Sequence, residues 1–123
     1  MIELIPGLPD EVVGLRAKGT ITGKDYEELV VPEIEARLDR HKKIRLLYVL
    51  DEAFEGVDAR AAWEDTKVGL KHLFQFERIG VVSDRDWVRG MVRTLGFLFP
   101  CEVRVFPNAN IDDARSWIVE GSK

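Results

Sequence analysis

The chain has 123 residues, of which 46% are hydrophobic and 33% charged, a balance typical of one globular domain rather than a disordered chain. Its net charge of −4 argues against nucleic-acid binding, which requires a basic surface. The single cysteine, Cys101, excludes an internal disulfide, and no apolar run approaches the roughly 20 residues of a membrane span. The N-terminus lacks the basic and apolar regions of a signal peptide. We therefore expect one cytoplasmic domain covering residues 1–123.

The N-terminal part predicts an antiparallel hairpin at one side of a sheet. Residues 1–5 form a short strand candidate, and turn-forming residues fill Pro6–Asp10. Val13, Leu15 and Ala17 then alternate with Gly14, Arg16 and Lys18, which is typical of a strand with one solvated face.

The first helix is predicted to start at Thr22, with Asp25 three residues later completing the cap. Pro32 lacks a backbone donor and predicts a kink or a restart. Residues 40–43 are basic, and they either stabilise the negative end of this helix or form a phosphate or lipid-headgroup patch; we favour the first interpretation. The buried stripe is expected at Tyr26, Leu29, Val30, Ile34 and Leu38.

Residues 43–50 form a mostly apolar run between charged flanks, which predicts a strand buried on both faces. The segment Asp51–Gly56 is rich in acids and predicts a loop before a second helix capped by Asp58. The inner side of this helix is expected at Trp63, Leu70, Leu73 and Phe74.

Residues 78–83 predict a short buried strand, after which Ser83 or Asp84 is expected to cap a third helix. Residues 102–106 predict a strand with one polar face, and a last helix is expected to start at Asn110. The residues expected to point inward from these two helices are Trp87, Met91 and Leu95, then Ala114, Trp117 and Ile118.

The succession of strands and helices predicts an α/β fold with a mixed, largely parallel five-stranded sheet, an N-terminal hairpin and four helices. Crossover connections between parallel strands account for the helices, and the hairpin makes the sheet mixed. The order of the strands in the sheet stays open.

Several segments, in their order and spacing, resemble the SpoIIAA-like family, which is related to the STAS domains of anti-sigma-factor antagonists. The resemblance implies a compact α/β sandwich similar in shape to the CRAL-TRIO lipid-binding domains. It also implies binding of lipid-like ligands or membrane surfaces, with no established chemistry. The segments that carry it are residues 19–26, 43–50, 63–65, 71–72, 76–84 with Trp87, 103–106, and the late Ala114 and Trp117.

One feature of the related antagonists is missing. They carry a phosphorylatable Ser or Thr just after the central strand, whereas residues 51–58 contain no hydroxyl side chain. The acids in this segment are a fixed negative charge, which is not a switch. Partner switching is therefore not implied for this chain.

Neither catalysis nor metal binding is predicted. Cys101, His41, His72 and Ser83 show no spacing that pairs a nucleophile with a base, and the glycines match no phosphate-binding loop. The acids between Asp51 and Asp58 offer oxygen ligands, but their spacing is not that of a known cation loop. We therefore expect no enzyme activity, no catalytic residue, no metal and no cofactor.

A ligand site is predicted beyond the carboxyl ends of the strands 43–50 and 78–83, where α/β sheets usually bind ligands. Aromatic side chains would form apolar walls, and the starts of two helices would hold an anionic headgroup. The acids would repel such a headgroup unless they cap the helices. The predicted site residues are Asp51, Phe54, Trp63, Ser83, Asp84 and Trp87.

Two functions from different classes remain. The first is a non-enzymatic domain that binds an apolar or amphipathic, lipid-like ligand or associates peripherally with a membrane. The alternative is a homodimeric protein-interaction module related to the antagonists. The apolar stretch Leu95–Pro100 fits a core, a dimer interface or a membrane contact equally well.

Overall fold

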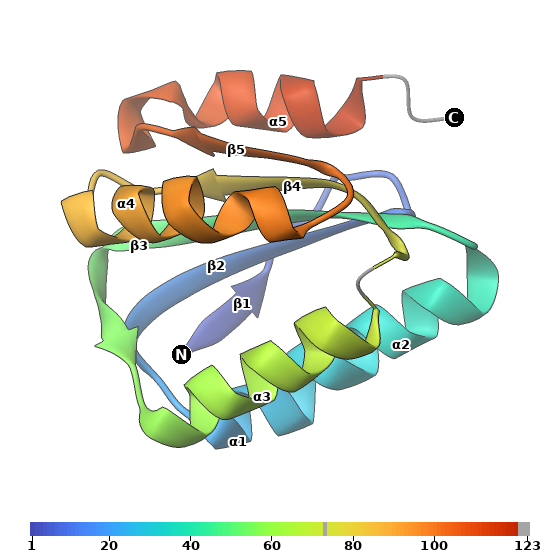
Figure 1. Ribbon diagram of the computed structural model, residues 1–123, viewed down its shortest axis with the longest axis horizontal. Coiled ribbons are helices and arrows are strands. Elements are labelled where there is room, and N and C mark those ends of the chain that lie inside the picture. Colours follow the sequence, from blue (N-terminus) through green and yellow to red (C-terminus); the bar gives the residue numbers. More distant parts are fainter. Residues whose placement is uncertain (73, 121–123) are drawn as a thin grey trace.

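The computed structural model describes residues 1–72 and 74–120, and it leaves the side chains of Gly69, Leu70 and Leu95 undescribed. The expected inward positions of Leu70, Leu73 and Leu95 thus lie outside the described residues. Five strands form one sheet in the order β1-β2-β3-β4-β5 (Figure 1). Among the described strands, β1 and β2 pair antiparallel and the other neighbours pair parallel. The strands are β1 (Ile2–Leu4), β2 (Val12–Ile21), β3 (Ile44–Val57), β4 (Phe76–Val82) and β5 (Glu102–Phe106).

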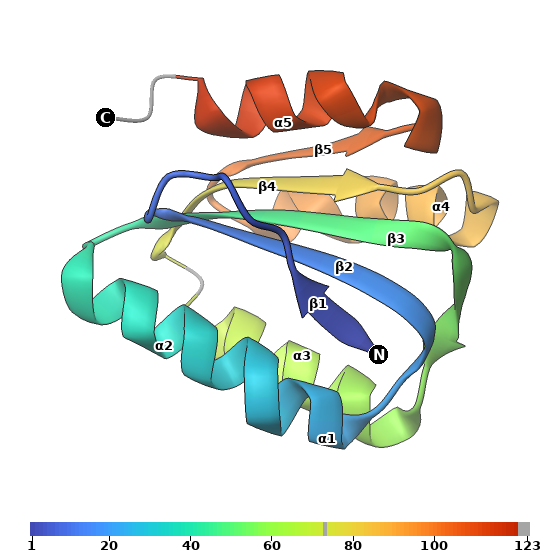
Figure 2. The same cartoon turned by 180° about the vertical axis from the view of Figure 1, so that it is seen from behind.

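The sheet has helices on both faces, as Figures 1 and 2 show. Helix α5 packs on one face, whereas the other helices cover the opposite face. This arrangement confirms the predicted α/β fold with a mixed, largely parallel sheet. The helices are α1 (Gly23–Asp25), α2 (Val31–Arg40), α3 (Ala59–Lys71), α4 (Asp86–Leu95) and α5 (Ile111–Val119), and a π-helical turn, Tyr26–Val30, joins α1 to α2.

The first helical segment begins after Thr22, as predicted, and its hydrogen-bonding pattern changes near Pro32, where a kink or a restart was predicted. The Thr22 N–H donates to Asp25 Oδ2 at 2.9 Å, and the Asp25 N–H donates to Thr22 Oγ1 at 3.3 Å, so the predicted cap is confirmed. Pro32 lies in the first turn of α2, directly after the π-helical turn. The Val31 N–H donates to Tyr26 O across the π-helical turn, and this change in the bonding pattern lies directly before the proline that lacks a donor.

The basic end of α2 is engaged by one carboxylate. Arg40 Nε and His41 Nε2 both lie 2.8 Å from Asp10 Oδ2, and hydrogen bonds to these two side chains hold the pKa of Asp10 well below its usual range. Arg40 and His41 therefore have a structural role through Asp10, whereas Lys42 and Lys43 are exposed.

Strand β3 is buried on both faces, as predicted. Leu47 and Val49 face α5, while Leu46, Tyr48 and Leu50 face the other helices. This division follows from the two-residue period of a strand.

Arginine side chains from the sheet hold the end of α5. Arg45 is buried, and its Nη1 donates to Ile118 O at 2.9 Å while its Nε donates to Glu77 Oε1 at 2.7 Å. Arg78 Nη1 donates to Trp117 O at 2.8 Å. These cations satisfy the last carbonyls of α5, where the helix dipole is negative.

The prediction of a loop over Asp51–Gly56 is wrong, because β3 continues to Val57. This last part pairs with β2 alone, through Gly19 with Phe54 and Ile21 with Val57. The register shifts at Gly19, and Gly19 and Gly56 adopt φ values of 62° and 135° that side chains rarely adopt. Acids suit this extension because only Phe54 is buried, so Glu52 and Glu55 stay in water.

The predicted inner side of α3 is also wrong. Trp63 and Phe74 are 61% and 73% exposed, whereas Ala61 is fully buried. Asp65 and Val68 follow Ala61 at helical spacing on the inner side, where Val68 packs against the core. The small side chain of Ala61 faces the core. The prediction instead assigned the inner side to the large apolar side chains of Trp63 and Phe74, which are exposed.

The predicted cap of α4 is wrong as well. The helix begins at Asp86, and Arg85 precedes it with no side-chain cap bond. Ser83 is fully buried, and its Oγ accepts from the Arg85 N–H at 3.1 Å within the connecting loop. Asp84 Oδ1 instead accepts from the Asn108 N–H at 2.9 Å. The start of α5 at Asn110 and the burial of Ala114, Trp117 and Ile118 are confirmed.

Because β3 is central in the sheet, we expect its buried side chains to contribute strongly to the free energy of unfolding. Leu47→Ala removes a fully buried side chain from the α5 face and should lower the free energy of unfolding by about 2–5 kcal/mol. Urea denaturation measures this change. Leu98→Ala, at an exposed position, is the control and should change stability by no more than about 0.5 kcal/mol. Equal small effects of both substitutions would contradict the assignment of β3 to the core.

Candidate functional site

A cavity of about 400 Å³ lies between α3 and α4, over the face of the sheet opposite α5. Its floor comes from β2, β3 and β4, and its walls come from the helices. Most lining side chains are apolar. Those from the sheet include Leu15, Leu46, Leu50, Ile79 and Val81, and those from the helices include Val30, Ile34, Val68, Val88, Met91 and Val92.

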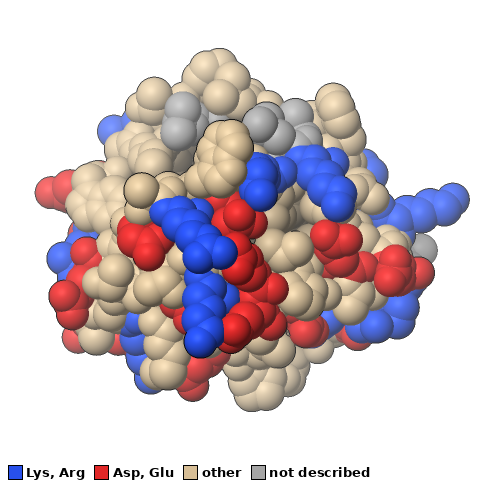
Figure 3. Space-filling view, turned by 90° about the horizontal axis from the view of Figure 1, so that it is seen from below, with Lys and Arg blue, Asp and Glu red and all other residues tan. Residues whose placement is uncertain are grey.

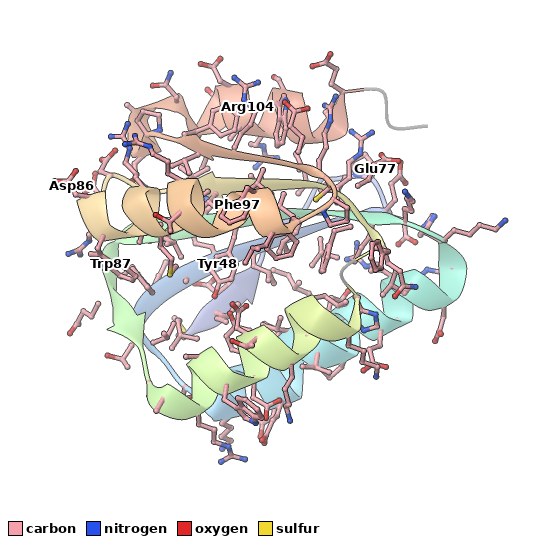
Figure 4. The ribbon with its side chains drawn as sticks, in the orientation of Figure 1. Tyr48, Glu77, Asp86, Trp87, Phe97 and Arg104 are labelled. Atoms are coloured by element: carbon pink, nitrogen blue, oxygen red, sulfur yellow. The ribbon has the colours of Figure 1, made fainter. Side chains whose placement is uncertain are left out.

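The rim of the cavity is aromatic. Phe54, from the extension of β3, stacks on Trp87 of α4 with ring centroids 6.0 Å apart and an interplanar angle of 29°. Trp87 and Met91 were predicted to point inward. Both border the cavity, but each is about half exposed to solvent. Figure 4 shows Trp87 at the first turn of α4 and Tyr48 in the space between α3 and α4.

Three polar side chains meet at one place in this apolar cavity. The hydroxyl oxygens of Tyr26 and Tyr48 lie 3.0 Å apart. The Tyr26 hydroxyl donates to Asp65 Oδ1 at 2.9 Å. The three residues come from the π-helical turn, from β3 and from α3, and all border the cavity. We call them the Tyr–Tyr–Asp group.

Removal from bulk water dominates the titration of this group. Burial among protein atoms raises the pKa of Asp65, and the hydrogen bond from Tyr26 opposes that rise in pKa. Asp65 is exposed to solvent, and it also lines the cavity. Burial likewise raises the pKa of Tyr26, and it raises the pKa of Tyr48 to about 12, so both phenols are neutral at physiological pH.

The structure brings together two of the six predicted site residues, Phe54 and Trp87. Trp63 points away into solvent, and Ser83 is enclosed in its loop. Asp51 Oδ1 accepts from the Ala53 N–H at 3.0 Å, and its Oδ2 lies 3.7 Å from Arg16 Nη1. Asp51 and Asp84 therefore make bonds elsewhere and do not line the cavity.

The start of α3 is not open to the cavity. Asp58 Oδ1 accepts from the Ala61 N–H at 2.7 Å, which confirms the predicted cap. On α3 the lining begins one residue later, at Ala62. The amides at the start of α3, which the sequence suggested for an anionic headgroup, are therefore not presented to the cavity, whereas the carboxyl of Asp65 is.

The residues that sequence reasoning missed are those of the Tyr–Tyr–Asp group. The sequence places Tyr26 and Tyr48 at core positions, and it assigns no role to Asp65. The spacing along α3 could have indicated Asp65. It lies four residues after Ala61 and three before Val68, so the three side chains share one side of the helix. A carboxyl on the inner stripe of an amphipathic helix indicates a partner or a cavity.

A second exposed apolar surface adjoins the cavity at the end of α4. Phe97 and Leu98, in the short 3₁₀ turn Gly96–Leu98, are exposed, and Arg89 and Arg93 of α4 lie nearby around a shallow depression with Phe97. By contrast, Figure 3 shows basic and acidic side chains side by side across the face formed by α1, α2 and α3. Within residues 1–72 and 74–120, no helix is long and apolar enough to cross a membrane.

Other chemistry finds little support in the described part of the chain. No group of three or more His, Cys, Asp or Glu side chains there could hold a metal ion. Cys101 is partly buried, and burial raises the pKa of its thiol, which disfavours the reactive thiolate.

The comparisons with known proteins agree with this geometry. Residues 12–119 match the SpoIIAA-like family. The chain belongs to that family. A similar solved structure is an uncharacterised protein from Shewanella loihica, of the DUF3478 family and described as having a SpoIIAA-like fold. It is 28% identical, with a TM-score of 0.78, and the match covers 96% of this chain and 92% of that one. No curated protein matches the chain.

In this SpoIIAA-like protein, the segment after the central strand has a structural role. Residues 51–57 extend β3, and Asp58 caps α3. This segment contains no hydroxyl side chain.

The raised pKa of Asp65 predicts that stability depends on pH. A carboxyl whose pKa is higher in the folded state makes folding less favourable as pH rises from the unfolded value of about 3.8 through the folded value. Asp65→Asn removes this charge and keeps an oxygen that can accept from Tyr26. The variant should gain stability relative to the parent as pH rises from 4 to about 7.

Denaturation at a series of pH values measures this difference. Tyr26 and Tyr48, the titratable groups facing Asp65, are neutral over this range because their pKa values are raised. A difference in stability that does not change with pH would show that Asp65 titrates as an ordinary surface acid.

Proposed function

We propose that this SpoIIAA-like protein binds an amphipathic, lipid-like molecule in the cavity between α3 and α4. The observation that carries the proposal is the cavity itself, about 400 Å³ in volume, lined by apolar side chains and holding one polar group. Ligand pockets in proteins range over about 300–1,000 Å³ and combine apolar walls with a few polar groups. A molecule with an apolar tail and a polar head matches both parts.

Binding is favoured over catalysis by the side chains that border the cavity. Its hydroxyl and carboxyl side chains are Tyr26, Tyr48, Asp65 and Thr66. Catalysis by a nucleophile needs a base within hydrogen-bond reach and an orienting group. The tyrosines are held protonated, and the Thr66 hydroxyl donates to its own helix at Ala62 O, 2.9 Å away, so none of these hydroxyls is activated.

The hydrophobic effect would supply most of the affinity. Transfer of apolar surface from water contributes about 25 cal/mol per Å² on both partners. The stacked rings of Phe54 and Trp87 offer a flat apolar surface at the rim, where a chain would enter.

A second role, contact with a membrane surface, is favoured by the exposed apolar side chains of α4 and the turn after it. Trp87, Met91, Phe97 and Leu98 are exposed, with Arg89 and Arg93 on the same helix as Trp87 and Met91. Amphipathic helices with apolar and basic faces lie at lipid interfaces, where anionic lipids attract the arginines. Such contact would place the aromatic rim of the cavity against the source of the ligand.

Filling the cavity should abolish ligand binding. Val81→Phe adds bulk from β4 into the cavity, so titration with a micelle-free amphiphile such as dodecanol should give heat in the parent and much less in the variant. Tryptophan emission should change on binding in the parent and in Trp63→Phe, but little in Trp87→Phe, because only Trp87 borders the cavity. Equal binding by folded Val81→Phe would place the ligand elsewhere.

Membrane contact should depend on the turn after α4. In a flotation assay, vesicles that contain anionic lipid should carry the parent protein, whereas Phe97→Ser with Leu98→Ser should remain in the lower fraction. Phe74→Ser removes an equally exposed aromatic residue beyond α3 and should float like the parent. Failure of the parent to float, together with a dimer in native mass spectrometry, would instead favour the interaction module.

A further inference from the structure

The hydrogen bonds of the Tyr–Tyr–Asp group can be assigned proton by proton. Asp65 as a carboxylate can only accept, so the Tyr26 hydroxyl proton points to Asp65 Oδ1. The Tyr26 oxygen then accepts from Tyr48, because the hydroxyl proton of Tyr26 is already used. Both phenolic protons are therefore engaged within the group.

What remains for a ligand is a set of acceptors. The second oxygen of Asp65, Oδ2, has lone pairs that the Tyr26 bond does not use, and the Tyr48 oxygen has lone pairs as well. Thr66, the other hydroxyl at the cavity, donates to Ala62 O. The lining side chains thus offer a ligand several acceptors and no uncommitted hydroxyl proton.

The negative charge of Asp65 has no positive charge beside it in the described part of the cavity lining. Among the described residues that border the cavity there is no Lys, Arg or His to balance Asp65. A carboxylate that borders apolar walls is stabilised when a cation pairs with it. A bound cation with hydrogen-bond donors would supply both the missing charge and the missing protons.

We propose that the head of the ligand is a protonated primary amine that donates hydrogen bonds to Asp65, while its alkyl tail lies along the apolar walls of the cavity. The inference rests on the proposed function, because it assigns the head of the same amphipathic ligand. It replaces the anionic headgroup that the sequence suggested. A carboxylate or phosphate head would meet the negative charge of Asp65, with no cation among the described lining side chains to offset that charge.

The test compares three amphiphiles that share one tail, namely dodecylamine, laurate and dodecanol, below their aggregation concentrations and at neutral pH. Calorimetric titration of the parent protein should give an affinity for dodecylamine at least about tenfold higher than for laurate, equivalent to about 1.4 kcal/mol. Dodecanol, which has a donor but no charge, should lie between them.

Asp65→Asn should lose about tenfold in affinity for dodecylamine while its affinity for dodecanol stays within about twofold, because the amide carries no charge and its NH2 group can donate to the alcohol oxygen. Glu64→Gln is the matched control, since it removes a charge from the next position on α3, where the side chain pairs with Lys67 rather than facing the cavity. It should bind all three amphiphiles like the parent.

The outcomes separate the two proposals. If none of the three amphiphiles binds, the proposed function fails and the inference fails with it. If laurate binds as tightly as dodecylamine, or if folded Asp65→Asn keeps the preference for the amine, the inference is wrong while lipid binding stands. The order of affinities in the parent decides the question even if the Asp65 variant does not fold.

Discussion

Strand β3 imposes the constraint on which the rest of the structure depends, because it is buried on both faces and lies between β2 and β4. Its alternate side chains supply two separate cores. Leu47 and Val49 pack under α5, which Arg45 and Arg78 hold by its last carbonyls. Tyr48 points to the opposite face, so the same strand that anchors α5 also forms the floor of the cavity.

The cavity exists because α3 and α4 cover one face of the sheet without filling the space between them. The Tyr26–Asp65 hydrogen bond ties α3 to the helical turn before α2, and the Tyr48 hydroxyl ties that turn to the sheet. A carboxyl and two phenols border an otherwise mostly apolar cavity, where polar groups are unfavourable unless they are paired. This group therefore combines a structural bond with a surface left open to the cavity.

The two proposals place different demands on the same region. A ligand cavity requires α3 and α4 to stay apart, and a membrane contact requires the far side of α4 to remain uncovered. Trp87 serves both, since it stacks on Phe54 at the rim and is about half exposed. Membership of the SpoIIAA-like family fixes the fold but names no ligand, so the chemistry must come from the side chains of this chain.

The sequence alone determined the strands, the largely parallel sheet, the caps at Thr22 and Asp58, and the burial of β3 on both faces. These features follow from local periodicity and from single capping residues, which act over a few positions. The extension of β3 to Val57 could not be predicted, because pairing with β2 at Gly19 overrides the loop-like composition of residues 51–56. The Tyr–Tyr–Asp group was equally hidden, because its three members lie far apart in sequence and meet only when α3 packs on the sheet. Local patterns fix which segments form, but long-range packing decides which of their faces meet and where a space is left between them.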